Sequence, residues 1–143
     1  MPNATQNDLD EDTFIGLELP LNFSGNNGFF NRTKTAIQQA KHNIKNLLLT
    51  RIGERLGNPL FGAGLYAVLF EQEGDDLESK VEEVVNSAMS RWLPFINIEK
   101  IETTFSTNNR NTINVSMQFS LDIDPTSIEK LNIEVTDPGG GSY

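Results

Sequence analysis

Apolar side chains first take on a regular spacing after residue 30. From about Asn31 to Thr50 they recur every three or four positions, which places them on one face of a helix. The members of this stripe are Ile37, Ala40, Ile44, Leu47 and Leu48. The pattern therefore predicts a first helix that packs this face on a core.

Two further helices are indicated before residue 94. A short helix is expected to turn three apolar side chains inward, those of Leu65, Val68 and Leu69. A longer one follows, and Asp75 with Glu78 fits a capping box at its start. Its apolar stripe comprises Leu77, Val81, Val84, Val85, Ala88 and Trp92. Pro94 cannot continue a helix and is expected to end it.

After Pro94 the apolar period changes to two, which is typical of strands. A first strand runs from Ile96 to Phe105 with a slip in phase that indicates a bulge, and a polar turn is expected over residues 107–111. The second strand alternates without interruption through Ile113, Val115, Met117, Phe119 and Leu121. A turn at Asp124-Pro125 is expected to lead to a final strand with Leu131, Ile133 and Val135.

The order of these elements predicts an α+β fold, with about three helices packed on a C-terminal antiparallel three-stranded meander. One face of such a sheet would be buried on the helices. Its edge strands would offer unpaired backbone groups to which a strand of another chain could add.

Three units are expected along the chain. Residues 1–28 are an acidic, flexible N-terminus followed by an extended arm, Phe14 to Phe23, that packs on its own domain or on a partner. Residues 29–136 are a single domain, and residues 137–143 are a flexible tail.

Composition excludes several kinds of function. Acidic residues outnumber basic ones 20 to 11, and the formal charge of −9 argues against nucleic acid as a partner. The absence of cysteine and the single histidine, His42, exclude disulfides, thiolate sites and a multi-histidine metal cluster within one chain, so we expect no metal or cofactor. No apolar run approaches the roughly 20 residues of a membrane span. The polar start of the chain is not a secretory signal, which favours folding in a cytoplasm or in a particle assembled there.

A catalytic role finds little support in the residue pattern. Glu54, Glu71 and Glu73 are candidate carboxylates for glycoside hydrolysis, but the only tryptophan lies on a core stripe and no carbohydrate-binding aromatic pattern accompanies them. His42 lies between lysines on a helix, where we expect it to be exposed, and no nucleophile elbow supports a Ser-His-Asp arrangement. We therefore expect no catalytic residues.

The most informative segment is Thr50 to Glu71. It reads as the end of one helix, a charged turn and the start of the next. Gly53 permits a positive φ, and Arg51 with Arg55 is expected to hold Glu54 or a terminal carbonyl. On chemistry alone, this is a well-built internal turn with no partner.

The string nevertheless resembles the small baseplate wedge family of contractile phage tails, also called lysozyme-like baseplate proteins and shared with type VI secretion baseplates. That family has a helix ending in Thr, then Gly-Glu-Arg, Pro, Phe-Gly, Leu and Leu-Phe-Glu. The matching residues are Thr50, Gly53, Glu54, Arg55, Pro59, Phe61, Gly62, Leu65, Leu69, Phe70 and Glu71. An upstream aromatic-aliphatic-Gly, followed by a proline, is similar to Phe14-Ile15-Gly16 and Pro20.

One family motif has changed in this chain. Family members carry Glu-Pro-Arg between the long third helix and the first strand, and this motif binds the helical bundle of the wedge. The matching residues are Leu93, Pro94 and Phe95. The resemblance thus implies a wedge contact here that is apolar, or else one made elsewhere.

The resemblance implies a structural role in the virion, with no membrane partner. Family members occur in six copies in the inner baseplate and bind larger wedge proteins beside the tube and hub. Their sheet starts the tail sheath by accepting strands of the first sheath ring. The residues assigned to this sheath-docking sheet are Ile113, Val115, Met117, Phe119, Leu121, Leu131, Ile133 and Val135.

Three alternatives stay open at this point. The first is a peptidoglycan-degrading lysozyme, the second is the same wedge role in a non-phage contractile system, and the third is a generic adaptor whose turn matches by chance.

Overall fold

The computed structural model describes residues 16–17, 32–33, 35–70, 76–106 and 112–136. Within these ranges the chain forms three helices and a three-stranded antiparallel sheet of order β3-β4-β5, which confirms the α+β meander. The expected turn over residues 107–111, most of the N-terminal arm and the tail lie outside the described residues. None of the helices described is long and apolar enough to cross a membrane.

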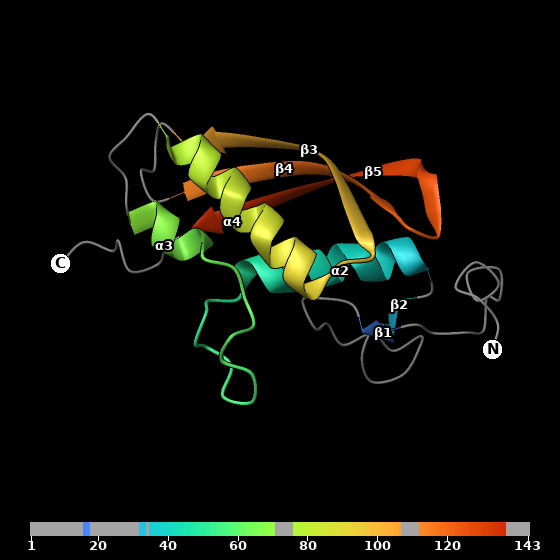
Figure 1. Ribbon diagram of the computed structural model, residues 1–143, viewed down its shortest axis with the longest axis horizontal. Helices are drawn as coiled ribbons and strands as arrows, with labels where there is room; N and C mark the ends of the chain where they lie inside the picture. The colour runs from blue at the N-terminus through green and yellow to red at the C-terminus, as the bar shows by residue number, and fades with distance from the viewer. Residues whose placement is uncertain (1–15, 18–31, 34, 71–75, 107–111, 137–143) are drawn as a thin grey trace.

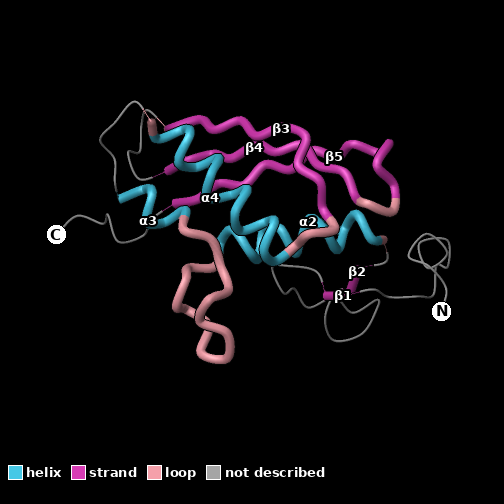
Figure 2. Tube along the Cα trace, in the orientation of Figure 1, coloured by secondary structure: helices cyan, strands magenta, loops and turns pink. Residues whose placement is uncertain are grey.

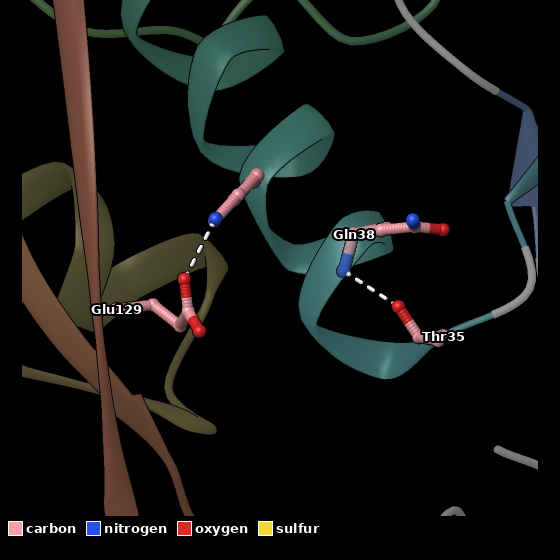
Figure 3. A network of polar contacts seen from close by, with 4 residues as sticks. Thr35, Gln38 and Glu129 are labelled. Atoms are coloured by element: carbon pink, nitrogen blue, oxygen red, sulfur yellow. Dashed lines mark hydrogen bonds and ion pairs between the residues drawn. The ribbon is translucent and has the colours of Figure 1, made fainter.

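Helix α2 spans Ala36–Leu49 and begins later than the sequence pattern predicts. Thr35 is its N-cap, since the side-chain oxygen of Thr35 accepts a hydrogen bond from the backbone N–H of Gln38 at 3.2 Å (Figure 3). The expected start at Asn31 is wrong, because β2 (Arg32–Thr33) pairs antiparallel with β1 (Gly16–Leu17). The described part of the arm therefore pairs with its own chain.

The other two helices match the apolar pattern more closely. Helix α3 spans Leu65–Phe70 and buries Leu65, Val68 and Leu69 as expected. Helix α4 spans Leu77–Trp92, and its C-cap residue precedes Pro94. Its N-cap is Asp76, without a side-chain capping bond, so the predicted capping box is wrong, and Asp75 lies outside the described residues.

The sheet consists of β3 (Ile96–Phe105), β4 (Thr112–Leu121) and β5 (Asp124–Thr136). The predicted bulge is confirmed, because the β3–β4 register shifts between Ile98 and Lys100. The turn expected at Asp124-Pro125 is wrong, since Asp124 already pairs with Leu121 across the β4–β5 hairpin. Pro125 is tolerated there because β5 is an edge strand, where a missing N–H need not break a ladder.

The core lies between one face of the sheet and the helices. Figure 1 shows α2 and α4 on the same side of the sheet, and α4 contacts β3 while α2 and α3 contact β5. Fully buried side chains from both layers meet there, including those of Ile44, Leu47, Val85, Met117 and Phe119. An ion pair at 2.8 Å between Lys41 of α2 and Glu129 of β5 lies at the margin of this contact (Figure 3).

Candidate docking surfaces

The loop from residue 50 to residue 64, here called the α2–α3 loop, is closed at its base by backbone contacts. The carbonyl oxygen of Thr50 accepts a hydrogen bond from the Ala63 N–H at 3.1 Å, and Arg51 forms a parallel bridge with Ala63. The hydroxyl of Thr50, a largely buried residue, donates to the Asn46 carbonyl. Gly62 lies at φ +130°, and a Cβ at this position would come within 2.5 Å of the Thr50 oxygen. The two ends of the loop therefore approach closely only because residue 62 is glycine.

The outer part of the loop is held by its own turn. Gly53, at φ +91°, donates its N–H to the Pro59 carbonyl at 2.7 Å. The Glu54 carboxylate accepts a hydrogen bond from the Arg51 N–H at 2.9 Å, while the Glu54 N–H donates to the Arg51 carbonyl at 3.1 Å. Glu54 therefore acts as a cap of this turn.

Arg55 ties the loop to the helices. Its guanidinium donates to the Asn46 side chain of α2 at 3.0 Å and lies 4.2 Å from the centre of the Phe61 ring. Phe61 in turn contacts Trp92 of α4 edge-on, with ring centres 5.3 Å apart. The expectation that Arg55 holds Glu54 or a terminal carbonyl is replaced by this cation–π and amide contact.

The remaining residues of the family motif have structural positions. Leu65 and Leu69 are core residues of α3, and Phe70 ends that helix, while Glu71 lies outside the described residues. The motif therefore builds the joint between α2 and α3.

The α2–α3 loop also exposes three aliphatic side chains that the sequence interpretation did not single out. Ile52, Leu56 and Leu60 are 59%, 100% and 57% exposed. In the sequence, these three side chains could have been found by their regular spacing of four residues within a segment that is predicted to be a loop and not a helix.

Leu93, Pro94 and Phe95 divide between core and surface. Leu93 is the C-cap of α4 and is buried, whereas Pro94 is exposed and the Phe95 side chain is 45% exposed. Phe95 lines an apolar cleft of about 310 Å³ between α2 and the β4–β5 hairpin, together with Ala36, Ala40, Leu121 and Ile123. An apolar contact at this altered motif would thus use Phe95 and this cleft.

The eight side chains assigned to sheath docking all lie in the core. Ile113, Val115, Met117, Phe119 and Leu121 of β4, and Leu131, Ile133 and Val135 of β5, face the helices and are buried. They are unable to contact another protein without unfolding. The part of this sheet to which another strand could add is instead the backbone of an edge strand.

The hydrogen-bond pattern identifies which backbone groups of β5 point away from β4. Ser106 donates its N–H to the Thr112 carbonyl. Over the regular register from Thr112 to Gln118, the backbone N–H and C=O groups of even-numbered residues of β4 therefore point to β3, and those of odd-numbered residues point to β5. Val135, Ile133 and Leu131 pair opposite the odd-numbered residues of β4. The backbone groups of the residues between them, including Asn132, therefore point to the outer edge of β5.

The described residues show no constellation for catalysis or metal binding. Glu54 is engaged in the loop turn, and Glu71 and Glu73 lie outside the described part of the chain. His42 is half-buried on α2, where an exposed position was expected. No group of three His, Asp or Glu side chains in the described ranges is placed to hold a metal ion.

Solved structures share this fold at low sequence identity. A Geobacter sulfurreducens protein provisionally named a tail lysozyme superposes with a TM-score of 0.64 at 18% identity, covering 73% of this chain and 93% of the other. A chain of the anti-feeding prophage baseplate gives a TM-score of 0.63 at 17% identity, covering 74% of this chain and 83% of the other. A chain of the type VI secretion baseplate complex gives 0.55 at 15% identity, covering 70% of this chain and 92% of the other.

These likenesses place the chain in a class of small α+β proteins whose fold also occurs in baseplates of contractile injection machines. No curated protein matches the sequence. The sequence pattern of the family described as baseplate wedge protein gp25 matches residues 34–126, which is more than half of the chain. The protein therefore belongs to the gp25 baseplate wedge family, as the resemblance of the Thr50 to Glu71 segment indicated.

Proposed function

We propose that this protein is a structural component of the baseplate wedge of a contractile phage tail, which joins larger wedge proteins and starts sheath assembly by strand addition to its sheet. The observation that carries the proposal is the family match over residues 34–126, which includes the sheet up to the start of β5. Six copies in the assembled baseplate and a position in the virion follow from the resemblance.

The edge of β5 suits strand addition better than the edge of β3. From Glu129 to Thr136, β5 keeps a regular register with β4, so its outer groups are evenly presented. The bulge after Ile98 interrupts β3, and bulges are a common means of preventing edge pairing. Backbone hydrogen bonds to β5 would provide affinity for an incoming sheath strand.

The contact with larger wedge proteins is assigned in part to Phe95 and its cleft. Leu93 and Phe95 stand where the family has Glu and Arg, so an ionic contact at these positions is lost. The exposed Phe95 ring would instead bury apolar surface when a partner binds. Burial of apolar surface stabilises a complex by about 25 cal/mol per Å² before the costs of association.

The test is a proline at the outer edge of β5. Asn132→Pro removes an N–H that points away from β4, so the sheet keeps its internal ladder while an incoming strand loses a donor. Asn132→Ala is the matched control, because it removes the same side chain and keeps the N–H. We expect baseplates with Asn132→Pro to assemble without sheath, and those with Asn132→Ala to grow sheath normally.

Normal sheath growth from folded Asn132→Pro protein would refute the role of the β5 edge. Thermal unfolding of the purified variants, compared with the unchanged protein, establishes that the substitution has not unfolded the domain.

The same role in a non-phage contractile system is the second candidate, favoured by the shared fold with chains of the anti-feeding prophage and type VI baseplates. The proteins encoded beside this chain distinguish the two, since a phage carries capsid genes.

We infer no peptidoglycan-degrading activity, because the Glu54 carboxylate already caps its own loop. Purified protein is expected to leave peptidoglycan intact, and hydrolysis that Glu54→Gln or Glu71→Gln abolishes would contradict this.

A further inference from the structure

The α2–α3 loop exposes apolar side chains to solvent, although hydrogen bonds hold its backbone in a defined shape. Figure 2 shows the loop projecting from the helices, with its base beside α3. Its hydrogen bonds at Gly53, Glu54 and Ala63 and the stack of Arg55 on Phe61 fix its shape. A loop ordered in this way presents Ile52, Leu56 and Leu60 without a further ordering cost on binding. Exposed apolar side chains gathered in one place mark interaction sites.

A cleft lies between this loop and α4. Its volume is about 380 Å³, and the loop contributes Ile52 and Leu60 to one wall. The other wall is a stripe of α4 at positions three and four residues apart, formed by Val84, Ser87, Ala88 and Arg91. Val84 and Ala88 of this wall also belong to the stripe that packs in the core, whereas Ser87 and Arg91 are exposed. The cleft therefore borders the edge of the core along α4.

Small residues form the floor of the cleft. Gly62, Ala63 and Gly64 line it, and a Cβ at Gly64 would lie 3.6 Å from the Val84 side chain. A glycine floor beside small helical residues allows close approach of another backbone, as in tight helix–helix contacts.

The charged residues at the two ends of the cleft would orient a bound ligand. Glu83 lies at one end of the α4 wall and Arg91 lies two turns further along, where its guanidinium is 5.1 Å from the Trp92 ring centre. A complementary ligand has an apolar centre, a carboxylate facing Arg91 and a cation facing Glu83. An amphipathic helix meets these requirements, since its residues at helical spacing fill one groove.

We propose that this cleft, with Leu56 at the tip of the loop, docks an amphipathic helix of a larger baseplate protein, oriented by Glu83 and Arg91. The inference rests on the proposed wedge function and names the chemistry of one of its partners. It adds a site distinct from Phe95 and from the β5 edge.

A photocrosslinker in the assembled particle tests the occupant. p-Benzoylphenylalanine replaces Leu56 in one sample and Ile128 of β5, which is 57% exposed, in the control. We expect crosslinks from position 56, mapped by mass spectrometry, in one apolar helical segment of a larger baseplate protein, and none to that segment from position 128. Crosslinks from position 56 to a second copy of this chain, to a polar loop, or to no protein would overturn the proposal.

Substitutions test the cleft itself, with affinity measured against the crosslinked protein in purified form. Leu60→Asp is expected to weaken binding at least about tenfold, as for a central contact residue. Ile128→Asp, with the same exposed fraction as Leu60, should leave binding unchanged. Gly64→Ala should fold normally, because its methyl group makes only ordinary contacts, yet it should weaken binding several-fold by raising the floor. Unchanged affinity for both Leu60→Asp and Gly64→Ala would refute the site.

The orientation of the docked helix is tested by reversing the charge at Arg91. Arg91→Glu is expected to weaken binding several-fold, and replacing the partner's facing carboxylate by lysine should restore it. If Asn132→Pro blocks sheath growth while Leu60→Asp particles form normally, the proposed function stands and this inference fails. If Leu60→Asp prevents incorporation while Asn132→Pro grows sheath, the docking cleft and the wedge role stand, and strand addition at the β5 edge fails.

Discussion

At the scale of single residues, three glycines of the α2–α3 loop have different structural roles. Gly62 combines a positive φ with a backbone oxygen 2.5 Å from any added Cβ, whereas Gly53 has a positive φ and open space around it. Gly57 has neither a positive φ nor a neighbour within 4 Å. Alanine is therefore expected to cause a steric clash and backbone strain at Gly62, backbone strain alone at Gly53, and neither effect at Gly57.

We predict that Gly62→Ala lowers the free energy of unfolding by about 3 kcal/mol or more, and Gly53→Ala by about 1 kcal/mol. Gly57→Ala should change it by less than about 0.5 kcal/mol. Urea denaturation of the three variants measures these differences. Equal values for Gly62→Ala and Gly57→Ala would show that the base of the loop is not held by close contact.

Asp124 gives a pH dependence of known sign. The hydroxyls of Ser127 and Thr126 donate to its carboxylate and lower its pKa below the ordinary value of 3.8. Because the folded pKa is lower, this contribution to stability is fully present above 3.8 and is lost as the pH falls through the folded pKa.

We therefore predict that Asp124→Asn flattens the loss of stability as the pH falls below about 4, measured as the free energy of unfolding in urea. A loss as steep as that of the unchanged protein would contradict the assignment. Serine in place of Thr126 is the control, since it keeps a hydroxyl donor beside the carboxylate.

At the scale of elements, the start of α2 depends on a single cap. Thr35→Ala removes the acceptor of the Gln38 N–H and is predicted to cost about 1 kcal/mol, while Thr35→Ser should cost much less. Equilibrium unfolding in urea measures both. Equal stability of the alanine and serine variants would show that the bond to Gln38 contributes nothing to the helix.

The sequence predicts the interiors of the helices and strands better than their ends. Apolar spacing reports burial, so it located the interiors of α2, α3 and α4 and the regular alternation of β4. The ends of elements depend on competing local contacts. Pairing of Arg32 with Leu17 shortened α2, and pairing of Asp124 with Leu121 lengthened β5 past a proline.

The candidate surfaces were less predictable, for a physical reason. Alternation identifies the buried face of a sheet, so it selected Ile113 and its companions, which are core residues and unable to reach a partner. The groups of β5 that point away from β4 are backbone atoms, which no side-chain pattern records. Likewise, the exposure of Leu56 depends on the path of the loop between Gly53 and Gly62.

At the scale of the whole molecule, the buried core and the proposed docking surfaces lie on the same elements. The sheet buries one face on the helices and has a regular edge at β5, while α4 packs in the core and also lines the α2–α3 loop cleft. The described residues of the family motif, from Thr50 to Leu69, form the joint between α2 and α3. An edge strand with regular register and two clefts are the features on which the proposed contacts with several neighbours rest.

The total free energy of unfolding limits which substitutions the domain can tolerate. Phe119 is fully buried on the central strand, and Phe119→Ala is predicted to cost about 3–5 kcal/mol, a large part of the stability of a domain of this size. Thermal unfolding measures the loss. A change below about 1 kcal/mol would mean that the layer between sheet and helices is not the core.

Strand addition at β5 is tested most directly by a cryo-electron microscopy reconstruction of the contractile particle that contains this chain. We expect the outer edge of β5 to be hydrogen-bonded, around Asn132, to a strand of the first sheath ring. A β5 edge that faces solvent in a particle with intact sheath, or that is covered by a protein other than the sheath, would contradict it.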